Sequence, residues 1–91
     1  MLSISFKTPK DIEEELKTKF KQKRKFFKIS QKELSLKSGV SLGSLKRFEQ
    51  SGKISFSSLL QLAVILGCLE EFENICNKKE EEFKSIEEIL K

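Results

Sequence analysis

Residues 30–49 read SQKELSLKSGVSLGSLKRFE, and this stretch carries the signals of two short helices. Ser30 and Ser41 suit the N-cap position, because a serine hydroxyl accepts a hydrogen bond from a free amide of the first helical turn. Glu33 follows Ser30 by three residues, the spacing of a capping box. Gly39 separates the two segments and allows the positive φ that often ends a helix. The two expected helices run from about 31 to 38 and from about 42 to 51.

Apolar residues mark one side of both helices as the side that packs inward. These residues are Leu34, Val40, Leu45 and Phe48. Ser35 is small and stands where the two helices would cross. Two helices arranged in this way form a helix-turn-helix, whose second helix enters the major groove in DNA-binding proteins. The pattern therefore favours DNA recognition by the second helix.

The region from Lys17 to Gly67 resembles the Cro/C1-type, or XRE-type, helix-turn-helix family. The matching positions are the Gln that opens the second helix (Gln31), the turn (Gly39 and Val40), the aliphatic anchor of the recognition helix (Leu45) and the acidic residue that closes it (Glu49). The resemblance implies that Glu49 pairs with Arg24. One departure is Ser35, where the family usually has Ala, and its hydroxyl needs a backbone partner.

Side chains near the beginning of the recognition helix are expected to face DNA. By the resemblance, the residues that read bases are Leu42, Gly43, Ser44 and Arg47. Arg47 has the best chemistry for this role, because a guanidinium can bond both O6 and N7 of guanine. Leu42 can contact a thymine methyl group. Gly43 has no side chain and would instead permit close approach.

Contacts with DNA phosphates are expected from basic side chains and from helix N-termini. The predicted phosphate-binding residues are Gln31, Ser41, Lys46, Lys23 and Lys25. Gln31 and Ser41 are included because they stand at the N-termini of the two motif helices. For Lys46, exposure to solvent without a phosphate contact is the alternative.

Charge is divided unevenly along the chain. Residues 1–68 carry fourteen Lys or Arg against six acidic residues, a net +8, whereas residues 69–91 carry four Lys against eight Glu, a net −4. The basic excess is greatest at Lys17, Lys19, Lys21, Lys23, Arg24, Lys25 and Lys28. This division indicates a nucleic-acid face in the first part and a different role for the tail. Taken alone, a lysine-rich helix is more often a solvated face.

The remaining elements are also expected to be helices. Thr8, Pro9 and Asp11 provide a cap, a proline at the first helical position and an acid in the first turn, so a helix is expected at about 9–27. Another helix is expected at about 56–66, and because it is apolar nearly all round, it is expected to be buried. A strand at 62–66 is its weaker alternative.

A short helix at 69–76 completes the expected domain. Residues 2–6 alternate between apolar and polar side chains, which is typical of either a short strand or a frayed end. The predicted fold class is all-α, a compact five-helix domain of the phage-repressor type. It covers residues 1–76, followed by a charged linker and an amphipathic tail at 77–91.

Apolar residues occur in two segments near the C-terminus, and in each segment they would either contact another molecule or pack on their own domain. Leu69, Phe72 and Ile75 form a stripe that would contact a second copy, as the XRE resemblance implies, or would seal its own domain. The apolar residues of the tail are Phe83, Ile86, Ile89 and Leu90. They would either bind a partner protein or fold back on their own domain.

Composition argues against several classes of function. Ninety-one residues make one small domain, with no apolar run for a membrane span and no signal peptide, so a cytoplasmic location is expected. The chain has no His, and no nucleophile has an evident activating partner, so no enzymatic activity is expected. Cys68 and Cys76 are expected as small buried residues rather than a disulfide or metal ligands. No metal and no cofactor are predicted.

Two functions fit these observations. The first is a homodimeric repressor that binds an inverted repeat in double-stranded DNA. The second follows from a closer resemblance to the HipB-like antitoxins, carried by Thr-Pro-x-Asp-Ile at 8–12, SLGSLKRFEQSG at 41–52 and LLQLAVILGCLEEFENI at 59–75. That resemblance implies an antitoxin that represses its own operon and binds a HipA-like kinase toxin. A stand-alone or phage-type repressor is the alternative, and an RNA-binding or purely structural module is disfavoured.

Overall fold

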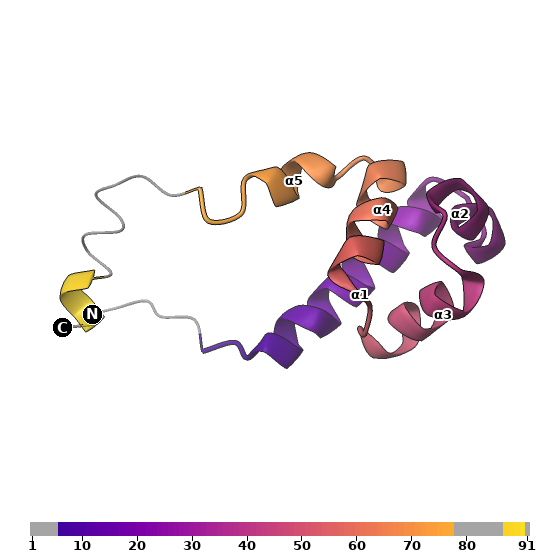
Figure 1. Ribbon diagram of the computed structural model, residues 1–91. Coiled ribbons are helices and arrows are strands. Elements are labelled where there is room, and N and C mark those ends of the chain that lie inside the picture. Colours follow the sequence, from indigo (N-terminus) through magenta and orange to yellow (C-terminus); the bar gives the residue numbers. More distant parts are fainter. Residues whose placement is uncertain (1–5, 78–86, 91) are drawn as a thin grey trace.

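The computed structural model describes residues 6–77 and 87–90, and these residues contain helices and no strand (Figure 1). The helices are α1 (Pro9–Phe26), α2 (Gln31–Ser38), α3 (Leu42–Ser51), α4 (Phe56–Leu66) and α5 (Leu69–Glu73), and residues 87–90 are also helical. The expected all-α helix-turn-helix fold is therefore confirmed. The strand considered at 62–66 is wrong, and the one considered at 2–6 lies almost wholly outside the described residues.

Reciprocal capping explains why α1 begins at Pro9. The backbone N–H of Asp11 donates to Thr8 Oγ1 at 3.1 Å, and the backbone N–H of Thr8 donates to Asp11 Oδ2 at 2.9 Å. The hydrogen bond that the Asp11 carboxylate accepts from the Thr8 backbone N–H is the main cause that holds the pKa of Asp11 below its ordinary value. Pro9 has no N–H to lose at the first helical position. The helix start is thus determined by side chains within four residues.

The turn between α2 and α3 accommodates the serine that replaces the usual alanine. Gly39 has a φ of 79° and ends α2. The Ser35 hydroxyl donates to the carbonyl oxygen of Val40 at 2.6 Å, which gives it the backbone partner that its position requires. The Val40 N–H donates to Ser38 Oγ at 3.1 Å. Two serine hydroxyls therefore hold the turn that sets the angle between the two helices.

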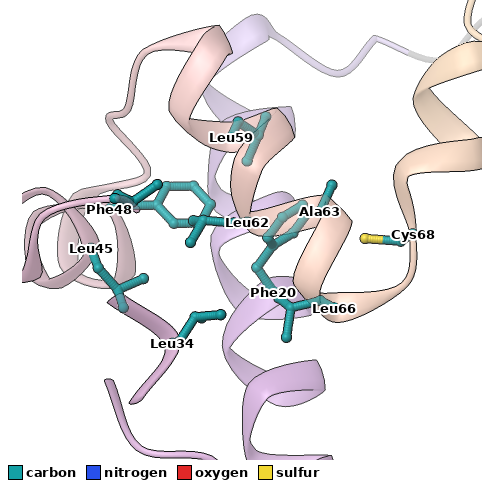
Figure 2. Packing of buried hydrophobic residues seen from close by; sticks show 10 residues of the cluster. Phe20, Leu34, Leu45, Phe48, Leu59, Leu62, Ala63, Leu66 and Cys68 are labelled. Carbon is teal, nitrogen blue, oxygen red and sulfur yellow. The ribbon is translucent and has the colours of Figure 1, made fainter. Parts of the chain in front are cut away.

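Helix α4 is the centre of the hydrophobic core (Figure 2). The buried side chains of α4 are Leu59, Leu62, Ala63 and Leu66, and those around them are Phe20 of α1, Leu34 of α2, Val40 of the turn, Leu45 and Phe48 of α3, and Cys68. The rings of Phe20 and Phe48 meet edge to face at 5.7 Å. The recognition helix is therefore anchored through the two residues expected to turn inward.

The expected burial of α4 is confirmed for one side of the helix only. Phe56 is 63% exposed and Val64 is 56% exposed. Helices α1, α2 and α5 pack against α4, and they leave another side of it in solvent. The expectation for the cysteines is half right: Cys68 is buried, whereas Cys76 is exposed. Cys76 lies beyond α5, which ends at Glu73 and not at the expected residue 76.

A buried ion pair connects α1 to the end of α3. The Arg24 Nε donates to Glu49 Oε2 at 2.7 Å, and a terminal guanidinium nitrogen donates to Glu49 Oε1 at 2.9 Å. Another guanidinium nitrogen donates to the carbonyl oxygen of Ile29 at 3.0 Å. The Gln31 side-chain amide donates to Glu49 Oε1 at 2.9 Å. One carboxylate thus joins the end of α1, the start of α2 and the end of α3.

This network determines the ionisation of Glu49. Burial alone would raise the pKa of the carboxyl group, but hydrogen bonds from Arg24 and Gln31, together with the Arg24 charge, outweigh burial and hold the pKa below its ordinary value of 4.5. A bidentate guanidinium–carboxylate pair of this kind is stronger and more directional than an exposed lysine pair. Either partner left alone would be a buried unpaired charge, which is costly. The pair therefore mainly fixes the position of α3 relative to α1.

The other side of α3 approaches α1 closely. Lys17 Nζ donates to the carbonyl oxygen of Gln50 at 3.3 Å. Gly52 ends α3 with a φ of 79°, and a Cβ at this residue would lie 3.0 Å from the carbonyl oxygen of Glu13. Both the positive φ and the close approach require glycine here. The C-terminal end of α3 is therefore fixed against the first half of α1.

Replacing a buried residue of α4 tests the position of the core. We expect Leu62→Ala to lower the free energy of unfolding by about 2–5 kcal/mol, because it leaves a cavity among fully buried side chains. Val64→Ala removes apolar atoms from an exposed position of the same helix and serves as the matched control. It should change stability by about 0.5 kcal/mol or less. Chemical denaturation measures both, and equal losses would contradict this core.

A double-mutant cycle tests the ion pair. Arg24→Met and Glu49→Leu should each cost about 3–5 kcal/mol, because each leaves the other charge buried without a partner. The double variant should lose less stability than the sum of the two single-variant losses, with a coupling energy above about 1 kcal/mol. Additive losses in urea denaturation would mean that the two side chains do not interact in solution.

The same pair predicts a dependence of stability on pH. Because folding lowers the pKa of Glu49, this carboxylate contributes stability above its unfolded pKa, and the contribution is lost as pH falls through the folded pKa. The stability advantage of the wild type over Glu49→Gln should therefore shrink as pH falls below about 4.5. An advantage that stays constant from pH 7 to about pH 3 would contradict the lowered pKa.

Candidate nucleic-acid interface

Helix α3 divides its side chains between the core and the surface. Leu45, Phe48 and Glu49 are buried, whereas Gly43, Ser44, Lys46 and Arg47 are exposed and Leu42 is partly exposed. Within residues 6–77 and 87–90, no hydrogen bond or ion pair engages the guanidinium of Arg47 or the ammonium of Lys46. Every residue predicted to read bases therefore lies on the solvent side of α3 or at its edge.

Hydrogen bonds within the fold limit what Ser41 and Gln31 can donate. The Ser41 hydroxyl accepts from the Ser44 N–H at 3.1 Å and donates to Ser44 Oγ at 2.9 Å. A phosphate contact from Ser41 in this geometry would have to use its backbone N–H, because phosphate oxygens only accept. Gln31 uses one amide N–H on Glu49, which leaves the second for a ligand.

A polar hollow of about 360 Å³ lies between α3 and the start of α4. It is lined by Ser44, Arg47, Lys53, Ile54, Ser55 and Ser58. Ser55 caps α4 by accepting from the Ser58 N–H at 3.1 Å, so the N-terminus of α4 opens beside Arg47. Lys53 pairs with Glu13 at 2.9 Å. Sequence reasoning did not include Lys53 or the start of α4, although both directly follow the recognition helix in the chain.

The basic residues of α1 lie on different sides of the helix. Lys21 lies close enough to Glu49 to lower the pKa of its carboxyl group. Lys25 follows Lys21 by four residues, so both lie on one side of α1. Lys23 instead lines the hollow between α1 and α5, where its charge acts on Cys68. Of these lysines, Lys21 and Lys25 therefore share a side of α1 near Glu49, whereas Lys23 lies beside α5.

The apolar stripe near the C-terminus is mostly used within its own domain. Leu69 and Phe72 pack against the core, and the Phe72 ring lies 6.3 Å from Phe20 and 6.4 Å from Phe56. Ile75 is 55% exposed. Of the predicted tail residues, Ile89 and Leu90 are exposed, whereas Phe83 and Ile86 lie outside the described residues. The sealing interpretation thus accounts for two of the three stripe residues.

No helix within the described residues is long and apolar enough to cross a membrane. No group of three or more His, Cys, Asp or Glu side chains in that part of the chain could hold a metal ion. Burial raises the pKa of the Cys68 thiol, Glu71 adds to the effect and Lys23 opposes it, so the thiol is mainly protonated at neutral pH.

The comparisons with known proteins agree with the geometry of α2 and α3. A model of the helix-turn-helix family matches residues 20–72, which include α2, α3, α4 and most of α5. No curated protein and no solved structure gives a match. The matched segment begins at Phe20 in the core and contains both members of the Arg24–Glu49 pair. The chain therefore belongs to the XRE-type helix-turn-helix family of DNA-binding regulators.

Proposed function

We propose that this protein is a sequence-specific transcriptional regulator that reads the major groove with the exposed side of α3. The observation that carries the proposal is Arg47: its guanidinium is exposed and has no partner among residues 6–77 and 87–90, on a helix held by buried Leu45 and Phe48. A guanidinium held in this way has five donors for base edges. Ser44 and Leu42 lie on the same helix within one turn and would read neighbouring bases.

Phosphate contacts on both sides of α3 would fix the protein in register on the duplex. On one side we propose Gln31, Lys21 and Lys25. On the other side we propose Lys53 and the N-terminus of α4, whose free N–H groups favour an anion. Lys46 and the backbone of Ser41 would complete this set. The helix would thus be placed in the groove by groups that themselves carry no sequence information.

We further propose that the protein acts as a homodimer on an inverted repeat. A single helix-turn-helix reads few base pairs, and a two-fold pair would place half-site centres about 34 Å apart. Of the predicted contact residues, exposed Ile75 gives the proposal most of its support, since Leu69 and Phe72 already pack within the domain. Analytical ultracentrifugation with and without operator DNA tests the pairing, and one protein per operator would contradict it.

The finer proposal is an antitoxin that represses its own operon and binds a HipA-like kinase toxin. It is supported by the HipB-like sequence resemblance and by exposed Ile89 and Leu90, which DNA binding does not require. Glu87 and Glu88 in the same segment would repel phosphate, so this segment fits a protein better than DNA. A kinase-like reading frame beside the gene would favour this proposal over a stand-alone repressor.

The decisive variants for DNA recognition are Arg47→Ala and two lysine variants. Binding is measured with a duplex from upstream of the gene and with its single-base variants. Arg47→Ala should lose about 1–3 kcal/mol of DNA-binding free energy, and its preference for the base at one position should relax. Lys25→Ala should weaken all duplexes alike and reduce the slope of log K against log salt by about one unit. Unchanged base preference in Arg47→Ala would contradict the assignment.

Lys23→Ala is the matched control for Lys25→Ala, because both remove a lysine from α1. Lys23 lies on the α5 side of the helix, so its loss should change the salt slope by much less than one unit. A loss in affinity equal to that of Lys25→Ala would contradict the assignment of Lys23 to the hollow.

Replacing Gly43 with alanine is expected to raise the stability of the fold and to weaken DNA binding. A Cβ at Gly43 would meet no atom within 4 Å, and its φ is not positive, so the fold itself does not require glycine. Gly43→Ala should therefore raise the free energy of unfolding by about 0.5–1 kcal/mol. If the DNA backbone or a base edge approaches this Cα, the same change should weaken operator binding about tenfold.

The control for Gly43→Ala is Gln61→Ala, an alanine at an exposed position of α4. It should leave operator affinity unchanged. If Gly43→Ala were stabilised and bound the operator as tightly as wild type, close approach at Gly43 would be excluded.

A further inference from the structure

A second hollow, of about 420 Å³, lies between α1 and α5. Its apolar lining consists of Ile12, Leu16, Phe20, Cys68, Phe72 and Ile75. Ile12 and Ile75 are 44% and 55% exposed, so this lining presents apolar surface to solvent. We call it the α1–α5 groove.

Two lysines border the α1–α5 groove on its α1 side. Lys19 and Lys23 are four residues apart, and both line the groove. The ammonium group of neither lysine makes an ion pair or a hydrogen bond with another residue of the described chain. Glu71 is the one acidic residue among those that line the groove. The groove therefore combines an apolar floor with a net positive edge, which suits an acidic amphipathic segment.

The C-terminal segment of the same chain has this chemistry. Residues 83–91 contain two Glu and two Lys, and three further Glu at 80–82 directly precede them, so residues 80–91 together carry a net −3. Residues 87–90 are helical, with Ile89 and Leu90 exposed by 52% and 80%. In the sequence, Ile86 precedes them at the i, i+3 and i+4 spacing of a single helical face. Glu87 and Glu88 make no ion pair or hydrogen bond with another described residue.

We propose that the C-terminal segment, residues 83–91, docks in the α1–α5 groove of its own chain. Ile89 and Leu90 would cover Leu16 and Phe72, and Glu87 would lie near Lys19. The apolar surface that the groove and the segment expose separately would then be removed from water together.

Chain length favours docking within one molecule. Nine residues, 78–86, separate Asn77 from the helical residues 87–90. Nine residues can span roughly 30 Å, whereas the α1 wall of the groove from Ile12 to Lys23 is about 17 Å long. A connection of this length gives an effective concentration in the millimolar range, about a thousandfold above micromolar protein. The segment of a second copy would therefore compete poorly.

The docked segment would also regulate pairing between copies. Ile75 lines the groove and is the exposed residue of the stripe proposed for the homodimer. A second copy could contact Ile75 only after the C-terminal segment had dissociated from the α1–α5 groove. A protein that bound the segment would promote this dissociation. This consequence rests on the proposed homodimer, whereas the docking itself does not depend on it.

Cys68 provides a reporter inside the groove. The chain has two cysteines, so Cys76→Ser leaves Cys68 as the single thiol. In this background we would measure the rate of Cys68 alkylation by iodoacetamide in full-length protein and in protein truncated after residue 82. A docked population of about 80% would make the truncated protein react about fivefold faster. Circular dichroism would verify that both forms have the same folded helix.

Two further variants separate docking from a general loss of structure. Leu90→Asp keeps the full length and changes a residue that is exposed in this structure, and it should react as fast as the truncated protein. Lys19→Glu should reduce protection, and adding Glu87→Lys should restore it. Lys25→Glu is the matched control on α1 and should retain protection. Each full-length variant is compared with its own truncated form, so changes in the thiol pKa cancel.

Two results would overturn the proposal. The first is an equal alkylation rate for full-length and truncated protein. The second is protection that increases with protein concentration, which would mean that a second copy covers the groove. Because this experiment contains no DNA, its outcome is independent of the proposed regulatory function.

Discussion

Bidentate pairing of Arg24 with Glu49 is the interaction on which the orientation of the recognition helix depends. The carboxylate sits where the end of α1, the start of α2 and the end of α3 meet, and it accepts hydrogen bonds from Arg24 and Gln31. The hydrophobic core holds α3 in place through Leu45 and Phe48, but apolar contacts are not directional. The ion pair adds the direction, so Arg47 on the opposite side of α3 has a defined position.

The boundaries of α1 to α4 could be predicted from the sequence because the start of each carries a local signal, which α5 lacks. Serine or threonine caps precede α1 to α4, and the left-handed glycines Gly39, Gly52 and Gly67 follow α2, α3 and α4. These signals act within four residues and do not need the tertiary fold. The need of the Ser35 hydroxyl for a backbone partner was predictable for the same reason, and its acceptor is Val40.

Features that depend on packing could not be predicted in the same way. The apolar pattern of α4 does not say how many neighbours cover it, and exposed Val64 is the result. The spacing of lysines in α1 does not say which side meets α3, so the sequence did not separate Lys23, which lines the hollow beside α5, from Lys21, which lies near Glu49. Lys53 and the start of α4 directly follow α3 in the chain, but only the tertiary arrangement shows that they line one hollow with Arg47.

The central claim is that the exposed side of α3 reads DNA sequence. Selection from a pool of duplexes with a randomised central segment, at a fixed salt concentration, tests it most directly. The account predicts enrichment of one sequence with half-site centres about one helical turn apart. A pool that stays random through repeated selection, while the protein still binds DNA in a salt-dependent way, would contradict it. The protein would then bind the phosphate backbone alone.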